Sequence, residues 1–360
     1  MVACPRLLAP RAARRIVDGG MRAIGGAILL GLAVWVAGLH VFDLLHFILH
    51  GMLRSRWRVL RWLAAPHAMH HRWLDAQLRI HWDRQAANFF GHIVLEYGTQ
   101  LVFSVTLLFV LPAAAVAVAV ACQTIVFAYI ASERGLDPNH RPIDVLDAYQ
   151  PSFLALPAYH ALHHVWPDAH YSAYSKLVDW IVGGGTQLRG RRFALWGGDV
   201  PFGAALRVQL ERAGVAVADL EPGGDGDLEE TDVLVIASPD APRGTLVERF
   251  IGATRRRQLP PEVWAVQPDA VDGLARHYHG DPRVIYRALV VPPAVLGDPA
   301  RAARAAATAM FLVRRGLNFV PTMLGPTALR QLAAFRRTPA EPPDGGPVAR
   351  HRAELAAVAA

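Results

Sequence analysis

Residues 97–132 read YGTQLVFSVTLLFVLPAAAVAVAVACQTIVFAYIAS, a run of 36 residues without Asp, Glu, Lys, Arg or His. One helix needs about 20 apolar residues to cross a bilayer, so the run is long enough for two short spans. Pro112 lies near its middle, where a proline is tolerated at a turn or kink. The run therefore predicts a transmembrane hairpin. The alternative is one very long buried helix, for which a soluble chain of 360 residues rarely has room.

A second apolar segment, residues 23–39, lies behind a leader that carries several arginines. A signal peptide is the alternative reading, but no small-residue cleavage site follows the segment. The loop from Arg54 to Arg84 carries seven arginines, which favours a cytoplasmic position for it. A full crossing by the first segment would then place the arginine-rich leader outside, against the same rule. Whether this segment spans the bilayer or only enters it therefore stays open.

The composition excludes several classes of protein. With 53% hydrophobic and 19% charged residues, the chain is not disordered. Two cysteines are too few for a disulfide framework or a four-cysteine zinc site. The net charge of +7 comes from scattered arginines, since Lys176 is the only lysine, and nucleic acid is not an expected partner.

Histidines are concentrated in one half of the chain, with 13 of the 16 in residues 1–190. Most of these fall in three clusters with helical spacing, which places the imidazoles of each cluster on one helix face. Imidazole is a ligand for iron, zinc, copper and nickel, and eight imidazoles exceed the four ligands of one tetrahedral zinc. The clusters therefore predict two metal ions. Their members are His46 and His50; His67, His70 and His71; and His160, His163 and His164.

The predicted hairpin lies between the second and third clusters. Two crossings return the chain to the starting side, so all three clusters can meet at one membrane face. The isolated histidines His92, His277, His279 and His351 are interpreted as ordinary core or surface residues.

These motifs resemble the histidine boxes of the membrane-bound fatty acid hydroxylase/sterol desaturase superfamily. The matching stretches are His46-Phe-Ile-Leu-His50, His67-Ala-Met-His70-His71 and Leu156-Pro-Ala-Tyr-His160-Ala-Leu-His-His164, followed by Tyr171-Ser-Ala-Tyr and Leu177-Val-Asp-Trp. Asn139-His140 stands 20 residues before the last box, where the family has a single histidine. The resemblance covers about residues 40–190. One departure is Phe47, which stands where the family often has an arginine.

The resemblance implies two iron ions that activate dioxygen, a lipid or acyl substrate, and a separate electron donor of the reductase, cytochrome or ferredoxin type. The arginine-rich loop predicts that the histidine boxes and the C-terminal domain lie on the cytoplasmic side of an integral membrane protein. The implied iron ligands are His46, His50, His67, His70, His71, His140, His160, His163 and His164, with His81 and His170 as further ligands or as groups that orient them.

After residue 190 the sequence alternates between short apolar runs and helical segments, which predicts an α/β domain. Expected strands are residues 192–196, 215–219, 232–237, 262–267 and 284–291, and expected helices include residues 203–213 and 300–315. This part resembles the Rossmann fold of short-chain dehydrogenases. A nucleotide of the NAD(P) type would lie against Gly197, Gly198 and Gly203, with Asp219 on its ribose.

The nucleotide motif is degenerate. Pro201 stands where the middle glycine belongs, and the catalytic Tyr-x-x-x-Lys of short-chain dehydrogenases is absent, since four residues after Tyr278 the chain has Pro282. Without that lysine the tyrosine would not be activated for hydride chemistry. We therefore expect a vestigial, regulatory or weakly cofactor-binding domain.

The sequence thus predicts an α-helical membrane domain with a histidine-box metal centre, followed by an α/β Rossmann-like domain. The expected divisions are an arginine-rich leader (1–22), the membrane-embedded histidine-box domain (23–188), the Rossmann-like domain (189–337) and a disordered tail (338–360). The expected function is an O₂-dependent di-iron lipid hydroxylase or desaturase. The alternatives are a fatty aldehyde decarbonylase that forms a hydrocarbon, and a non-catalytic regulatory membrane protein.

Overall fold

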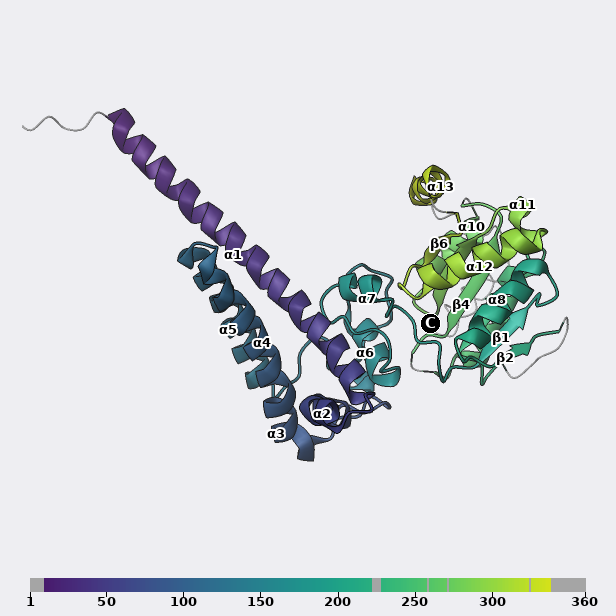
Figure 1. The fold of residues 1–360 in the computed structure, drawn as a ribbon, viewed down its shortest axis with the longest axis horizontal. Coiled ribbons are helices and arrows are strands. Elements are labelled where there is room, and N and C mark those ends of the chain that lie inside the picture. The colour runs from purple at the N-terminus through teal and green to yellow at the C-terminus, as the bar shows by residue number, and fades with distance from the viewer. Residues whose placement is uncertain (1–9, 222–227, 258, 271, 324, 338–360) are drawn as a thin grey trace, which may run out of the picture. The chain divides into compact units, whose positions relative to one another are not determined.

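The structure is a computed structural model that describes residues 10–221, 228–257, 259–270, 272–323 and 325–337, with only the backbone described for residues 10–20. The predicted tail and residues 1–9 of the predicted leader lie outside these residues. The described chain forms two compact units (Figure 1). Among the described residues, the first unit contains 10–74 and 80–137, and the second contains 75–79 and those from 138 to 337. Residues 138–188 therefore pack with the α/β part, although by motif they belong with the histidine boxes.

The first unit is helical. Its three longest apolar helical stretches, Met21–Leu53, Trp82–Phe109 and Ala113–Ser132, are each long and apolar enough to cross a membrane. Large apolar side chains such as Phe109, Leu29 and Ile125 are exposed on them, as expected for a surface that faces lipid. The elements are α1 (Pro10–Leu53), α2 (Arg58–Trp73), η1 (Trp82–Arg84), α3 (Gln85–Asn88), η2 (Phe89–Ile93), α4 (Val94–Thr106), η3 (Leu107–Phe109) and α5 (Ala113–Ser132).

The predicted hairpin is present in the first unit. Helix α4 and the short turn η3 end just before Pro112, which is the N-cap of α5. Small residues allow the helices to approach closely: a Cβ on Gly31 of α1 would lie 2.6 Å from the carbonyl oxygen of Ala115 on α5. Small residues at such crossings are typical of helices that pack in membranes.

The second unit begins with the segment that carries the last histidine motif. This segment contains η4 (Ile143–Val145), α6 (Pro157–Val165) and α7 (Leu177–Val182). Pro157 occupies the first turn of α6, where a proline is compatible with helix initiation. A small apolar cluster that includes Tyr149, Tyr159 and Leu162 packs against Ile285 of the sheet.

A parallel sheet of six strands, in the order β2-β1-β3-β4-β5-β6, follows. Its strands are β1 (Phe193–Trp196), β2 (Val217–Asp219), β3 (Val233–Ile236), β4 (Glu262–Gln267), β5 (Ile285–Val290) and β6 (Phe319–Pro321). The first five were predicted, whereas β6 was not. The helices are α8 (Pro201–Arg212), α9 (Arg243–Thr254), α10 (Gly273–His279), α11 (Pro293–Leu296), α12 (Pro299–Val313) and α13 (Pro326–Arg337).

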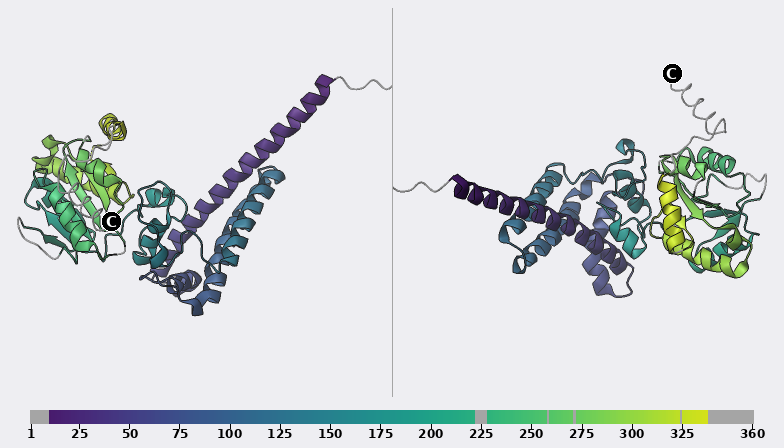
Figure 2. Two further views of the ribbon diagram at one scale, coloured as in Figure 1. Left: turned by 180° about the vertical axis from the view of Figure 1, so that it is seen from behind. Right: turned by 90° about the horizontal axis from the view of Figure 1, so that it is seen from above.

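Helices cover both faces of this sheet (Figure 2). Successive side chains of β4 point to opposite faces, so Trp264 packs with α8 and α12, and Val263 packs with α9 and α10. Apolar strands buried on both faces are typical of parallel sheets. The α/β architecture predicted from the alternating pattern is therefore confirmed for the second unit.

The turn from β1 into α8 depends on two glycines. Gly197 has a φ of +80°, and a Cβ on Gly203 would overlap the carbonyl oxygen of Gly197.

We expect Gly203→Ala to lower the thermal unfolding midpoint of the full chain, because overpacking of this kind costs about 1–3 kcal/mol. Gly252→Ala is the matched control. It lies in α9 with open space around its Cα, and should be neutral or stabilising by up to about 1 kcal/mol. Equal effects of the two substitutions would contradict the close approach.

Candidate metal centre

The first two histidine motifs converge inside the first unit. Helix α1 supplies His46 and His50, and α2 supplies His67 and His71. One ring nitrogen from each of these four lies within 4.8 Å of the corresponding atoms of the others. Three of the four side chains are buried, and the fourth, His71, is partly buried. The i, i+4 spacing along each helix is what places both imidazoles of a helix on the shared face.

The distances between these nitrogens fit a bound cation. The Nε2 atom of His50 lies 2.8 Å from Nε2 of His67 and 3.1 Å from Nε2 of His71. Two nitrogens at about 2.1 Å from one metal, at a right angle to each other, would be about 3 Å apart. The same two nitrogens in a tetrahedral arrangement would be about 3.4 Å apart. The observed distances are close to these values, so the nitrogens are spaced as ligands of one ion could be.

The second unit contains a similar set. His140 lies before α6, whereas His160 and His164 lie on consecutive turns of it. Their ring nitrogens also lie within 4.8 Å of one another, and all three side chains are buried. The Nε2 atoms of His140 and His160 are 3.0 Å apart. The single histidine predicted upstream of the last box is thus brought to that box.

The other histidine of each His-x-x-His-His motif, His70 or His163, has its Nδ1 within hydrogen-bond distance of an oxygen. The Nδ1 of His163 lies 2.7 Å from the carbonyl oxygen of Ala169, which can only accept. The Nδ1 of the neutral imidazole must therefore carry the proton, and Nε2 is the nitrogen that carries the lone pair. The Nδ1 of His70 lies 3.0 Å from Oδ1 of the buried Asn88. Such hydrogen bonds fix the tautomer and orientation of ligating histidines.

The structure does not bring every predicted histidine into these sets. Among the described residues, His81 and His170 belong to neither group of closely spaced nitrogens. His81 precedes η1, where its backbone N–H donates to the carbonyl of Trp73. His170 is buried with a φ of +59°, and its backbone N–H donates to the carbonyl of Gly184 at 2.6 Å.

Sequence reasoning overlooked three residues beside the first set. His92 was interpreted as an ordinary core or surface residue, but its ring stacks on His70 with the centroids 3.7 Å apart. Its Nε2 lies 4.0 Å from the carboxylate of Glu96, and both side chains are buried. These residues could have been found from their spacing, because Asn88, His92 and Glu96 follow one another at intervals of four residues. This spacing marks a polar helix face immediately before the uncharged run.

A buried carboxylate fixes the other motif helix. Asp179 of α7 accepts a hydrogen bond from the hydroxyl of Tyr159, the residue before His160, at 2.9 Å. It also accepts from the backbone N–H groups of Tyr171 and Ser172 at 2.8 and 2.9 Å. Burial raises the pKa of Asp179 to about 6, although these donors oppose the shift. The contact ties α6 to α7.

The chain's only lysine lies next to this carboxylate. The Nζ of Lys176 is 4.3 Å from the centre of the Tyr159 ring. Burial, together with Arg287, lowers the pKa of Lys176 to about 8.

The predicted nucleotide site forms a separate cavity of about 630 Å³ at the carboxyl ends of β1 and β2. Gly197, Gly198 and Asp219 line it, whereas Gly203 packs behind the turn. The cavity lies where the strand order reverses around β1, the usual ligand position in such sheets. Asp219 forms an ion pair with Arg207 of α8, so the acid predicted to bind a ribose has a competing partner.

Comparison of the chain with protein-family profiles, with curated proteins and with solved structures gives no significant match.

Asn88 provides a test of the metal site. We expect Asn88→Leu to weaken metal binding by about 10–100-fold, because it removes the acceptor for His70 at nearly constant volume. Asn88→Asp retains an acceptor and should keep most of the affinity. Metal content after dialysis against graded chelator concentrations measures both. Equal metal retention by Asn88→Leu and the unmodified protein would exclude this role.

The buried His170 predicts a pH effect. Burial lowers its pKa to about 3, so the neutral form is favoured in the folded state. Its contribution to stability is complete above pH 6.5 and is lost as pH falls from there toward 3. Between pH 7 and 5 the free energy of unfolding should fall by about 2 kcal/mol more in the unmodified protein than in His170→Asn. Asparagine tolerates the positive φ, and parallel pH curves for the two proteins would refute the expectation.

Proposed function

We propose that this protein is an integral membrane di-iron enzyme that uses O₂ to hydroxylate or desaturate a lipid. The observation that carries the proposal is the convergence of imidazole nitrogens from separate motifs, at ligand-to-ligand distances, in a chain with three helices long enough to span a membrane. The nine predicted histidines exceed what one tetrahedral ion takes, which supports a pair of ions. Imidazole suits iron, and the resemblance of the motifs selects it.

The chain's own residues would hold and shield such a centre. When bound, an iron pair supplies the capacity to activate dioxygen. Asn88 and the carbonyl of Ala169 hold His70 and His163 in the tautomer whose Nε2 is available. Burial of His46, His67 and His160 excludes water, which protects reactive chemistry from side reactions. The exposed apolar surfaces of the long helices are suited to contact with a lipid or acyl substrate in the bilayer.

We further propose that the electrons come from a separate reductase, cytochrome or ferredoxin. The nucleotide cavity lies at the carboxyl ends of the strands. The segment that follows α7 is attached at the opposite edge, where Thr186 donates to Glu262, the first residue of β4. A strand of six residues is about 20 Å long, so a nucleotide in the cavity would be far from this attachment.

Hydride chemistry in the second unit has little support. Burial and the neighbouring Glu248 raise the pKa of Tyr278 well above its ordinary value, and its hydroxyl donates to that carboxylate at 2.9 Å. A tyrosine so held is unsuited to the acid–base role that it has in dehydrogenases. Weak NAD(P) binding or a regulatory role fits the degenerate turn better. The feature that supports nucleotide binding is the cavity lined by Gly197, Gly198 and Asp219.

We propose that the histidine motifs and the second unit lie on the cytoplasmic side. The support is the seven arginines between Arg54 and Arg84, because short arginine-rich loops favour that side. Decarbonylation of a fatty aldehyde to a hydrocarbon is a second candidate reaction, and it would use the same ligands. Mass spectrometry of lipid extracts distinguishes a hydroxylated or desaturated product from a hydrocarbon.

Metal content and lipid products together test the function. In detergent-purified protein we expect iron, and we expect His67→Ala and His160→Ala each to lose most of it and to reduce the product to background. His277→Ala is the control, because that residue lies on α10, outside both histidine sets. Purified protein without any transition metal would refute the proposal. An unchanged lipid profile in cells that make normal amounts of both variants would support the non-catalytic alternative.

A further inference from the structure

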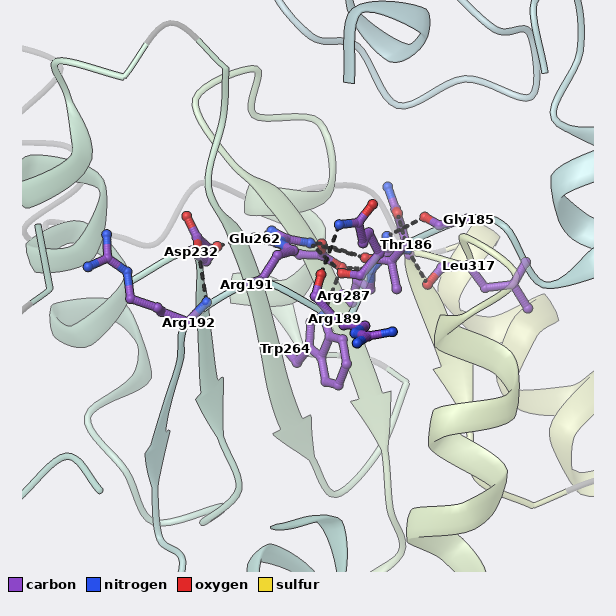
Figure 3. Close-up of polar contacts among 12 residues, drawn as sticks. Gly185, Thr186, Arg189, Arg191, Arg192, Asp232, Glu262, Trp264, Arg287 and Leu317 are labelled. Carbon is purple, nitrogen blue, oxygen red and sulfur yellow. Dashed lines mark hydrogen bonds and ion pairs between the residues drawn. The ribbon is translucent and has the colours of Figure 1, made fainter. Parts of the chain in front are cut away.

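A buried carboxylate between two arginines lies at the amino-terminal edge of the sheet (Figure 3). Glu262 accepts from Arg191 Nη1 at 2.6 Å and forms a second ion pair with Arg287. Its oxygens also accept from the Thr186 hydroxyl at 2.9 Å and from the Trp264 indole N–H at 2.8 Å. All three charged side chains are almost completely buried. The two guanidinium groups hold the pKa of Glu262 well below its usual range.

The charges of this cluster do not balance. The other acceptors of Arg287 are the carbonyls of Gly185 and Leu317 and the amide oxygen of Asn318, which are all neutral. Arg191 likewise donates to backbone carbonyls and to a hydroxyl besides Glu262. Two buried cations thus share one carboxylate, which leaves one positive charge without a counter-charge in the cluster. Uncompensated buried charge is costly, so an anion nearby would be favoured.

A further carboxylate close to Arg191, that of Asp232, has its own partner. Asp232 pairs with Arg257 at 2.9 Å, and its other oxygen accepts from the backbone N–H of Arg192. It is therefore not the missing counter-charge for Arg191. The Nε atom of Arg191 is buried and has no hydrogen-bond partner among the described residues. The Arg191 guanidinium group thus has a positive charge without a counter-charge in the cluster and a buried N–H without an acceptor among the described residues.

A cavity of about 380 Å³ lies directly beside Arg191, entirely within the second unit. Its walls combine cations with apolar surface. Arg256 contributes a further positive charge, the ion pair between Arg257 and Asp232 is neutral overall, and Val165, Trp166 and Leu259 are apolar. The Arg191 guanidinium lies 5.3 Å from the centre of the Trp166 ring, so charge and apolar surface are adjacent. A volume of this size is typical of sites for small ligands.

We propose that this cavity binds an amphiphilic anion, a carboxylate or similar headgroup that carries a short acyl chain. The headgroup compensates the charge of Arg191, and the acyl chain of the ligand covers Trp166 and Leu259. Neither the histidine sets nor the nucleotide cavity contributes a residue to this site, so the inference is independent of the proposed function. A purely inorganic anion would leave the apolar wall unused, and an uncharged alcohol would leave the excess charge in place.

Binding of octanoate to the full chain in lipid nanodiscs tests the proposal, with calorimetry as the readout. We expect saturable binding of octanoate, and binding of 1-octanol or inorganic phosphate that is at least about tenfold weaker, since hydrogen bonds to charged groups contribute about 1.5–3 kcal/mol. Equal affinity for 1-octanol would overturn the requirement for charge. Equal affinity for phosphate would overturn the requirement for an acyl chain.

Two variants distinguish octanoate binding in this cavity from partitioning of octanoate into the lipid of the nanodiscs. Arg191→Met removes the excess charge but leaves the Glu262–Arg287 pair intact, and should weaken octanoate at least tenfold. Leu259→Trp fills the cavity without changing any charge, and should weaken octanoate to the same extent even if Arg191→Met folds poorly. The matched control is Arg192→Met, the exposed neighbour that pairs with Glu230, and it should bind within twofold of the unmodified protein. Unchanged octanoate affinity in Leu259→Trp would overturn the site.

Discussion

Imidazole nitrogens held about 3 Å apart in buried positions are the constraint on which the rest of the first unit depends. Lone pairs that face one another at this distance repel unless a proton or a cation lies between them. His50 faces both His67 and His71 in this way, so a single proton cannot satisfy all three. The long helices therefore do more than anchor the chain. They hold together buried imidazoles whose nitrogens are close enough to bind a metal ion.

The outer contacts of these histidines show how the fold meets this constraint. Two of the three motif helices are fixed by a polar group from another segment: Asn88 for α2 and Asp179 for α6. A π-helical turn, Phe89–Ile93, follows Asn88 directly and brings His92 against His70. Such turns occur often at functional sites, because the extra residue changes the direction of the side chains that follow. The π-helical turn and the stacking of His92 on His70 therefore belong together.

Much of this architecture could be predicted from the sequence, because its signals are local. The uncharged run gave the hairpin with its break at Pro112, and alternation of apolar runs gave five strands. Strand β6 was not predicted, because its three residues, Phe319–Pro321, end in a proline, which argues against a strand. The packing of residues 138–188 with the sheet could not be predicted, since it depends on contacts between residues far apart in the sequence, such as Tyr149 with Ile285 and Thr186 with Glu262. Glu262 and Arg287 each look like an isolated charge in a strand until the fold pairs them.

Helix α1 has no break between its apolar part and its histidines. It runs from Pro10 to Leu53, so the stretch suited to a bilayer and the positions of His46 and His50 form one rod. A span that is longer than the hydrocarbon layer is accommodated by tilting. Tilting a rod displaces both of its ends, and here one end carries two of the nitrogens that must meet those of α2. In a bilayer, the thickness of the hydrocarbon layer would therefore affect the distances between the histidines of α1 and those of α2.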